Sequence, residues 1–377
     1  MRRDMARSLH QRALAWIDAR RRDGTRFRAA IGSEGQPTVY FLAPDYRTPS
    51  GGTMAIYRHV DILNAAGIAA AALHWRRGFR YAWFDNETRV TTLGAARIGR
   101  HDLVVASELD VDLLSRLPPG VRHVIFNQSG HLTWDRGLEL VNDHYLTNPD
   151  LAAVVTVSEH SRALVRYAFP HLDVRRIHLS LNRDLFYPAP AKRQNRIAYM
   201  PRPFRGNAEL VLKLLLTRGV LDGWELVPLK GLSHSDVARQ LRSTRIFLAL
   251  SDQEGFGLPA AEAMACGNYV IGHHGYGGRE FFDPAFSRAI ETADVLAFAK
   301  AVEEVLQNDA IDPDWCWLRG QRASAHVLAE YSAERERREV VELYAGLLGV
   351  KAQASVSALQ FRRENLGAIN ELRIGGT

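Results

Sequence analysis

Cysteine is nearly absent from this sequence, and long apolar runs are missing altogether. The 377 residues include only Cys266 and Cys316, too few for a disulfide framework and without metal-ligand spacing. No apolar run approaches the roughly 20 residues that a membrane-spanning helix needs. Charged residues interrupt every apolar stretch near the N-terminus, so no signal-peptide core is present there. We therefore expect a cytoplasmic protein whose two thiols are packed rather than reactive.

The net charge of +6 is concentrated in the first 28 residues, which hold nine arginines and three aspartates. Basic and acidic residues balance over the rest of the chain. No readout motif accompanies the basic segment, so a nucleic-acid partner is not expected. Two interpretations of the segment stay open: a solvated helix packed on the neighbouring domain, or peripheral contact with an anionic membrane surface.

From Thr38 onward, short apolar runs alternate with helical stretches, a pattern typical of parallel βαβ units. Pro188 and Pro190 interrupt this alternation, and a second βαβ series follows. We therefore predict an α/β protein with two Rossmann-like, doubly wound domains facing each other across a cleft. The predicted parts are a basic helical extension over 1–36, a first domain over 37–187, a second domain over 188–330, and helices over 331–377 that pack back toward the first domain.

A turn rich in glycine joins a predicted buried strand, Ile246–Leu250, to a predicted helix, Leu258–Cys266. Gly255 and Gly257 let the backbone turn sharply and approach a ligand closely. The amides and the positive dipole end of the new helix then point into the crevice at the carboxyl end of the strand, which suits a diphosphate. A glycine turn alone is a weak signal, because many such turns bind nothing.

Two glutamates, Glu254 and Glu262, bracket this turn eight positions apart. A carboxylate that accepts two hydrogen bonds suits the vicinal hydroxyls of a ribose. A second carboxylate near a transferred sugar can bind its hydroxyls and offset positive charge that develops at the anomeric carbon. The alternative for Glu262 is simple complementation of the helix dipole, worth roughly 0.3–1 kcal/mol.

The run Glu254-Gly-Phe-Gly-Leu-Pro-Ala-Ala-Glu262-Ala-Met-Ala-Cys-Gly267 resembles the E-x7-E motif of the retaining glycosyltransferases of family 4. The resemblance implies the GT-B fold, with an acceptor site in the first domain and a nucleotide-sugar donor site in the second. It also implies that Glu262 binds the ribose and Glu254 the sugar. The donor's phosphate and sugar would meet the amides of Gly255, Phe256, Gly257 and Leu258.

Other segments extend the resemblance over roughly residues 37–345. Gly51 and Gly52 are similar to the glycine pair that lets the first domain approach the donor phosphate. Arg202 and Arg205 stand where the family has an arginine and a lysine that neutralise the diphosphate. Gly277-Gly-Arg-Glu280 resembles the family's G-G-x-x-E stretch but is one residue shorter.

Polar groups also end the predicted strand Arg122–Asn127, where His131 could contact the donor sugar or position the acceptor; a structural histidine is the alternative. Trp75, Trp83 and Trp134 are candidates for stacking on sugar faces, with core packing as the alternative.

The resemblance implies a retaining, metal-independent transfer of sugar from a nucleoside-diphosphate-sugar to a saccharide or glycolipid acceptor, with no cofactor. Surface polysaccharide, lipopolysaccharide or glycolipid synthesis is the expected context. A nicotinamide-dependent dehydrogenase is disfavoured because 44–53 lacks the G-x-G-x-x-G turn. A non-catalytic nucleotide-sugar or glycan-binding subunit with the same fold remains an alternative.

Overall fold

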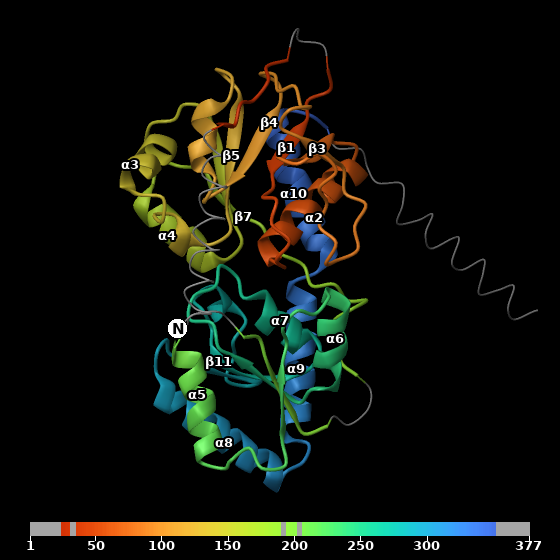
Figure 1. The fold of residues 1–377 in the computed structure, drawn as a ribbon, viewed down its shortest axis with the longest axis vertical. Coiled ribbons are helices and arrows are strands. Elements are labelled where there is room, and N and C mark those ends of the chain that lie inside the picture. Colours follow the sequence, from red (N-terminus) through yellow and green to blue (C-terminus); the bar gives the residue numbers. More distant parts are fainter. Residues whose placement is uncertain (1–23, 31–34, 190–193, 202–205, 352–377) are drawn as a thin grey trace, which may run out of the picture.

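The computed structural model describes residues 24–30, 35–189, 194–201 and 206–351. They form two lobes stacked along the long axis of the molecule (Figure 1). The predicted fold class is confirmed, since each lobe holds a fully parallel sheet flanked by helices. Most of the basic extension predicted over 1–36 and most of the tail beyond Val350 lie outside the described residues.

The N-terminal lobe is built on a seven-stranded sheet in the order β3-β2-β1-β4-β5-β6-β7. Its strands are β1 (Val39–Leu42), β2 (Ala70–His74), β3 (Val90–Thr92), β4 (Leu103–Ser107), β5 (Arg122–Asn127), β6 (Leu151–Thr156) and β7 (Val174–Arg176); its helices are α2 (Gly51–Ala65), α3 (Leu138–Val141) and α4 (Glu159–Ala168). The order reverses between β1 and β4, so a ligand crevice is expected where these two strands end.

The C-terminal lobe is built on a five-stranded sheet in the order β12-β11-β10-β8-β9, which reverses between β8 and β10. Its strands are β8 (Arg196–Tyr199), β9 (Glu225–Pro228), β10 (Ile246–Ala249), β11 (Tyr269–His273) and β12 (Ser287–Ile290). Its helices are α5 (Gly206–Thr217), α6 (His234–Ser243), α7 (Leu258–Ala265), α8 (Val295–Ile311) and α9 (Trp315–Glu330).

Local sequence explains where several of these elements begin and end. The central strands are buried on both faces, as the continuous apolar runs predicted. The Ser158 side chain accepts a hydrogen bond from the Ser161 amide at 3.2 Å and so caps the start of α4. Gly51 and Gly52 lie in the first turn of α2, because this helix begins at Gly51.

The sequence pattern missed β3, β7 and β12, which occupy sheet edges and are only three or four residues long. Their polar residues hide the apolar signal of a strand. It also missed α8. Within the described part of the chain, no helix is long and apolar enough to cross a membrane.

The last helix, α10 (Ala333–Leu348), leaves the C-terminal lobe and lies against α2 of the N-terminal lobe (Figure 1). The buried Glu336 anchors it: Arg58 Nε lies 3.0 Å from its carboxylate, and the amide and hydroxyl of Ser180 donate to it at 3.1 and 2.5 Å. Burial opposes ionisation, yet the Arg58 guanidinium holds the pKa of Glu336 below its ordinary value. Helix α10 thus ties the two lobes together.

We expect Glu336→Ala to lower the free energy of unfolding by about 3–5 kcal/mol, because it leaves the half-buried Arg58 without its carboxylate. The folded-state pKa of Glu336 is the lower one, so this stabilisation is present above the unfolded pKa and is lost as the pH falls through the folded value. Urea unfolding at neutral pH measures the loss. Glu334→Ala, on an exposed glutamate of the same helix, is the control; equal midpoints for the two variants would contradict the anchor.

Candidate active site

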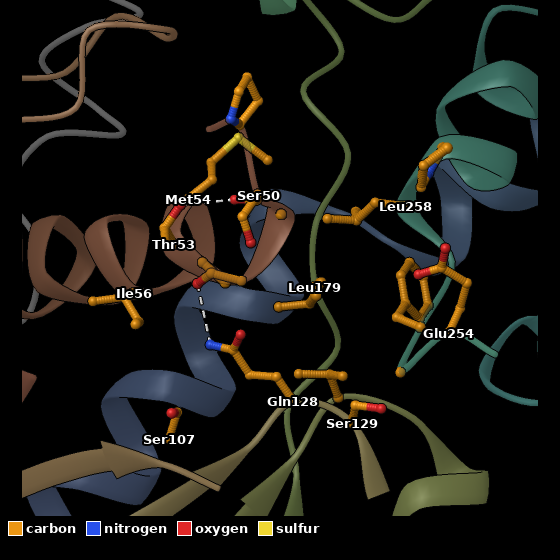
Figure 2. A pocket seen from close by; sticks show the side chains of 18 of the residues that line it. Ser50, Thr53, Met54, Ile56, Ser107, Gln128, Ser129, Leu179, Glu254 and Leu258 are labelled. Carbon is orange, nitrogen blue, oxygen red and sulfur yellow. Dashed lines mark hydrogen bonds between the residues drawn. The ribbon is translucent and has the colours of Figure 1, made fainter. Parts of the chain in front are cut away.

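A cavity of about 570 Å³ lies between the lobes, where the carboxyl ends of strands from both sheets meet (Figure 2). The N-terminal lobe contributes the segments after β1, β4 and β5, and the C-terminal lobe contributes the segment after β10 and parts of α6 and α7. The predicted site residues that line it together are Gly51, Gly52, Glu254, Gly255, Phe256, Gly257, Leu258 and Glu262. Both switch points of the sheet order therefore open into one space.

The turn that leads into α7 forms the C-terminal wall. Gly257 adopts a left-handed conformation with φ of 100° as the N-cap of α7, and Pro259 stands in the first turn. The amide of Glu254 donates to the carbonyl of Gly275 at 2.8 Å, which ties the turn to the loop after β11. The first amides of a helix have no partner within it, so this wall presents the chemistry that an anion needs.

Glycine at positions 51 and 255 lets the lobes approach more closely than any side chain would allow, and Gly52 has a similarly close neighbour within the N-terminal lobe. A Cβ on Gly255 would lie 1.7 Å from the carbonyl oxygen of Gln128, and one on Gly51 would lie 2.5 Å from the Leu258 side chain. A Cβ on Gly52 would meet the Gln128 side chain, whose amide donates to the Gly52 carbonyl at 3.1 Å (Figure 2). The two glycine-bearing turns therefore face each other directly across the cavity.

Glu262 lies in α7 with its side chain 9% exposed and accepts a hydrogen bond from His234 Nε2 at 2.9 Å. His234 is the first residue of α6, whose N-cap Ser233 accepts from the Asp236 amide. The ring of Phe186 packs against His234. Sequence reasoning did not identify His234, because nothing in the local pattern relates it to a helix 28 residues later.

Glu108 also lines the cavity, and the sequence analysis did not identify it. It follows β4 and accepts the amides of Gln128 and Ser129, each at 3.0 Å. Burial raises the pKa of Glu108 to about 7; the two amides oppose this rise and Asp110 adds to it. Glu108 therefore fixes the N-terminal segment against which Gly255 packs.

His131 lies beside the cavity and is not among the residues that line it. Its ring stacks on His160 of α4, with ring centroids 5.1 Å apart, and lies 5.0 Å from the ring of Tyr276 in the opposite lobe. Burial lowers the pKa of His131, and burial with repulsion from His131 and Arg279 lowers that of His160. Two uncharged imidazoles and a phenol thus make an aromatic contact between the lobes.

Tyr276 is held in a strained backbone conformation, with φ of 65° and ψ of −53°. The Gly277 amide donates to the Gly275 carbonyl at 2.8 Å and closes a γ-turn around it. A bulky residue rarely adopts a positive φ, and such strain concentrates at functional sites. The strain places the Tyr276 ring against the N-terminal lobe.

Glu280 bonds to the N-terminal lobe and is not among the residues that line the cavity. Its carboxylate accepts the amide of Glu159 at the start of α4 at 3.0 Å, the hydroxyl of Tyr331 at 2.9 Å and the guanidinium of Arg176. The stretch from the glycine pair to Glu280 is one residue shorter than in the family that it resembles. Here that stretch ends in an interlobe contact.

Three of the predicted site residues, Arg202, Arg205 and Phe256, need separate comment. Arg202 and Arg205 lie outside the described residues. Phe256 is in the cavity wall, but its ring is buried against Phe281 and Tyr331. It can therefore offer a ligand its main chain rather than its ring.

We expect Gly255→Ala to separate the lobes, because the added methyl group would overlap the Gln128 carbonyl, which Glu108 holds in place. Small-angle X-ray scattering should show a larger radius of gyration for this variant. Gly346→Ala is the control, since its Cβ would meet no atom within 4 Å. Scattering curves that superimpose for Gly255→Ala and the unmodified protein would contradict the close contact.

Glu108 predicts a pH dependence of stability. Its folded pKa of about 7 exceeds the ordinary value, so the folded state holds a proton that the unfolded state has released. The stability contribution is complete below the unfolded pKa and is lost as the pH rises through about 7. We expect Glu108→Gln to reduce the fall in unfolding free energy between pH 5 and pH 8 by roughly 2–3 kcal/mol. Glu139→Gln, at an exposed position, should leave that fall unchanged.

Comparison with known proteins agrees with this arrangement. The sequence model described as "Glycosyl transferases group 1" matches residues 225–315. An alpha-1,6-glucosyltransferase of Actinobacillus pleuropneumoniae is 23% identical over 287 residues, which cover 72% of this chain and 83% of the relative. All of the site residues described after β10 fall within the matched range.

Solved structures share the architecture. The sucrose-phosphate synthase of Thermosynechococcus elongatus superimposes with a TM-score of 0.66 at 17% identity, covering 83% of this chain and 99% of that one. Anabaena Alr3699/HepE, solved with UDP and glucose, gives a TM-score of 0.60 at 13% identity and covers 82% and 100% of the two chains. The chain is therefore a glycosyltransferase of the GT-B fold that carries a group 1 domain over residues 225–315.

Proposed function

We propose that the protein is a retaining enzyme of family 4 that transfers a hexose from a nucleoside-diphosphate-sugar to an acceptor hydroxyl. One observation carries the proposal: a single cavity joins the amide end of α7, the facing pair Gly51–Gly52 and the two carboxylates Glu254 and Glu262. The amides and glycines fit a diphosphate, and the carboxylates fit the hydroxyls on either side of it. A non-catalytic binding subunit would need the groups for the diphosphate and the ribose, but not the second carboxylate, Glu254, beside the transferred sugar.

The cavity also supports the charge changes of the reaction. The bond between the anomeric carbon and the diphosphate oxygen breaks, and negative charge grows on the leaving oxygen while the anomeric centre becomes positive. Helix amides fixed at the diphosphate stabilise the first charge, and Glu254 lies where it can offset the second. We propose that Arg202 and Arg205 add cations to the diphosphate side.

The acceptor oxygen bonds to the anomeric carbon on the face that the diphosphate leaves. A leaving phosphate oxygen takes the acceptor's proton, so neither a protein base, a metal nor a cofactor is part of the proposal. We propose that His131, through its stack with His160 and Tyr276, helps to hold the closed arrangement of the lobes. Its uncharged state, favoured by burial, places no additional positive charge beside His160, which already lies near Arg279.

UDP-glucose is the first donor to test. The Actinobacillus relative is an alpha-1,6-glucosyltransferase, and the Anabaena protein of the same fold was solved with UDP and glucose. For the acceptor we propose a saccharide or glycolipid of surface polysaccharide, lipopolysaccharide or glycolipid synthesis. The basic segment over 1–36 would let a cytoplasmic enzyme meet such an acceptor at an anionic membrane surface.

We expect the purified protein to release nucleoside diphosphate from one donor in a panel of uridine, guanosine, adenosine and thymidine diphosphate sugars. Glu254→Gln should lower that rate by about a hundredfold or more, because it removes the charge that offsets the anomeric centre. Glu342→Gln, on an exposed face of α10, is the matched control. Proton NMR of the product should show the anomeric configuration of the donor.

Several results would contradict the proposal. No release from any donor, with binding intact, would favour the non-catalytic subunit. An inverted anomer would remove the assignment to a retaining family. Loss of turnover in excess EDTA, restored by magnesium, would refute metal independence.

A further inference from the structure

Trp83 brings the N-terminal lobe to the far end of the cavity. It lies between β2 and β3, and it lines the cavity together with Leu232, His234 and Val237 of the C-terminal lobe. Its carbonyl accepts the His234 amide at 3.3 Å, and its indole meets the His234 ring edge to face, with centroids 6.0 Å apart. This contact between the lobes is separate from the one at Gly255.

The segment that carries Trp83 is held firmly by buried groups. The Tyr81 hydroxyl donates to the Pro44 carbonyl at 2.5 Å, and the Tyr57 hydroxyl pairs with His74 at 2.8 Å. The Asn86 side chain donates to the carbonyls of Tyr81 and Phe84 on either side of Trp83, at 2.9 and 3.0 Å. Phe84 packs edge to face against the Trp83 ring. The indole is therefore presented on a rigid support rather than on a free loop.

The order of groups along a nucleotide-sugar places the base at this end. The start of α7 suits the diphosphate, and Glu262, one helical turn further along, suits the ribose. Beyond Glu262 stands His234, which holds the carboxylate at 2.9 Å, and Leu232 and Val237, which flank His234 in the sequence, form an apolar wall of the cavity. A planar aromatic base matches this wall.

The indole N–H of Trp83 is buried and has no hydrogen-bond partner among the described residues. A buried indole N–H ordinarily has an acceptor, so its absence requires an explanation. Nucleobases carry carbonyl or ring-nitrogen acceptors on their edges and a π-face that stacks on aromatic rings. A base in this part of the cavity supplies what the indole lacks.

Resting on the proposed donor site, we propose that Trp83 closes over one edge of the donor's nucleobase and donates its indole N–H to an acceptor on that edge. His234 is then a positioning residue, which holds Glu262 for the ribose while its main chain ties α6 to Trp83. The N-terminal lobe thereby takes part in binding the nucleoside as well as the diphosphate. A bound nucleotide then bridges the lobes at both of its ends.

Calorimetric titration with UDP, GDP, ADP, TDP and inorganic pyrophosphate tests this inference at fixed salt concentration. Trp83→Ala should raise the dissociation constant of whichever nucleoside diphosphate binds by about tenfold and leave that of pyrophosphate unchanged. Trp83→Phe, which keeps a ring but lacks the N–H, should raise the dissociation constant of the same nucleotide by about fivefold. Trp317→Phe is the matched control, because Trp317 also has a buried indole N–H without a partner but does not line the cavity.

Unchanged nucleotide affinity in both Trp83 variants would overturn the inference. So would an equal loss of pyrophosphate binding, which would indicate a general effect on the cavity, or an equal loss in Trp317→Phe. Normal nucleotide affinity in Trp83→Phe, together with weaker binding in Trp83→Ala, would overturn the proposed hydrogen bond but not the contact between Trp83 and the base. Failure of the unmodified protein to bind any of the four nucleotides would instead refute the proposed function, and the inference with it. Thermal melting confirms that each variant is folded.

Discussion

The contact of Gly255 with the Gln128 carbonyl is the constraint on which the site depends. With no side chain between them, the two main chains lie so close that a Cβ on Gly255 would overlap the Gln128 carbonyl oxygen. Leu258 then reaches Gly51, and Glu254 comes to lie opposite the first turn of α2. Fixed amides and carboxylates act strongly only where water is excluded, so this approach sets the strength of every interaction in the cavity.

Two buried carboxylates and the partly exposed Glu280 hold the lobes at that distance. Glu108 fixes the main chain of Gln128 and Ser129, Glu280 joins the loop after β11 to α4 and β7, and Glu336 fastens α10 to α2. Each accepts at least two hydrogen bonds, which compensates for the loss of water around a polar group. Such groups determine the relative position of the lobes more than they add to net stability, because only one specific geometry satisfies all of their hydrogen bonds.

The sequence predicted much of this architecture, for identifiable reasons. A central strand such as β10 is a continuous apolar run, and the turn into α7 has glycines and a proline whose backbone preferences are local. The edge strands β3 and β7 escaped because each has only one valine followed by two polar residues, too few to show a periodic pattern. His234 and Glu108 escaped for a different reason. Their roles come from partners that are distant in sequence, and no spacing rule relates a residue after β4 to the amides after β5.

The two sheets reverse their strand order at different points of their own topology, yet both reversals open into the same cavity. A ligand that lies there touches both lobes, so it binds the closed arrangement more tightly than an open one. The ligand can shift the populations of the two arrangements by no more than the ratio of its affinities for them. The strained turn at Tyr276 and the uncharged stack of His131 and His160 lie on the interlobe contact beside the cavity and outside its wall. If the donor binds as proposed, its affinity would be coupled to the position of the lobes, and this contact would contribute to that position although it lies outside the cavity.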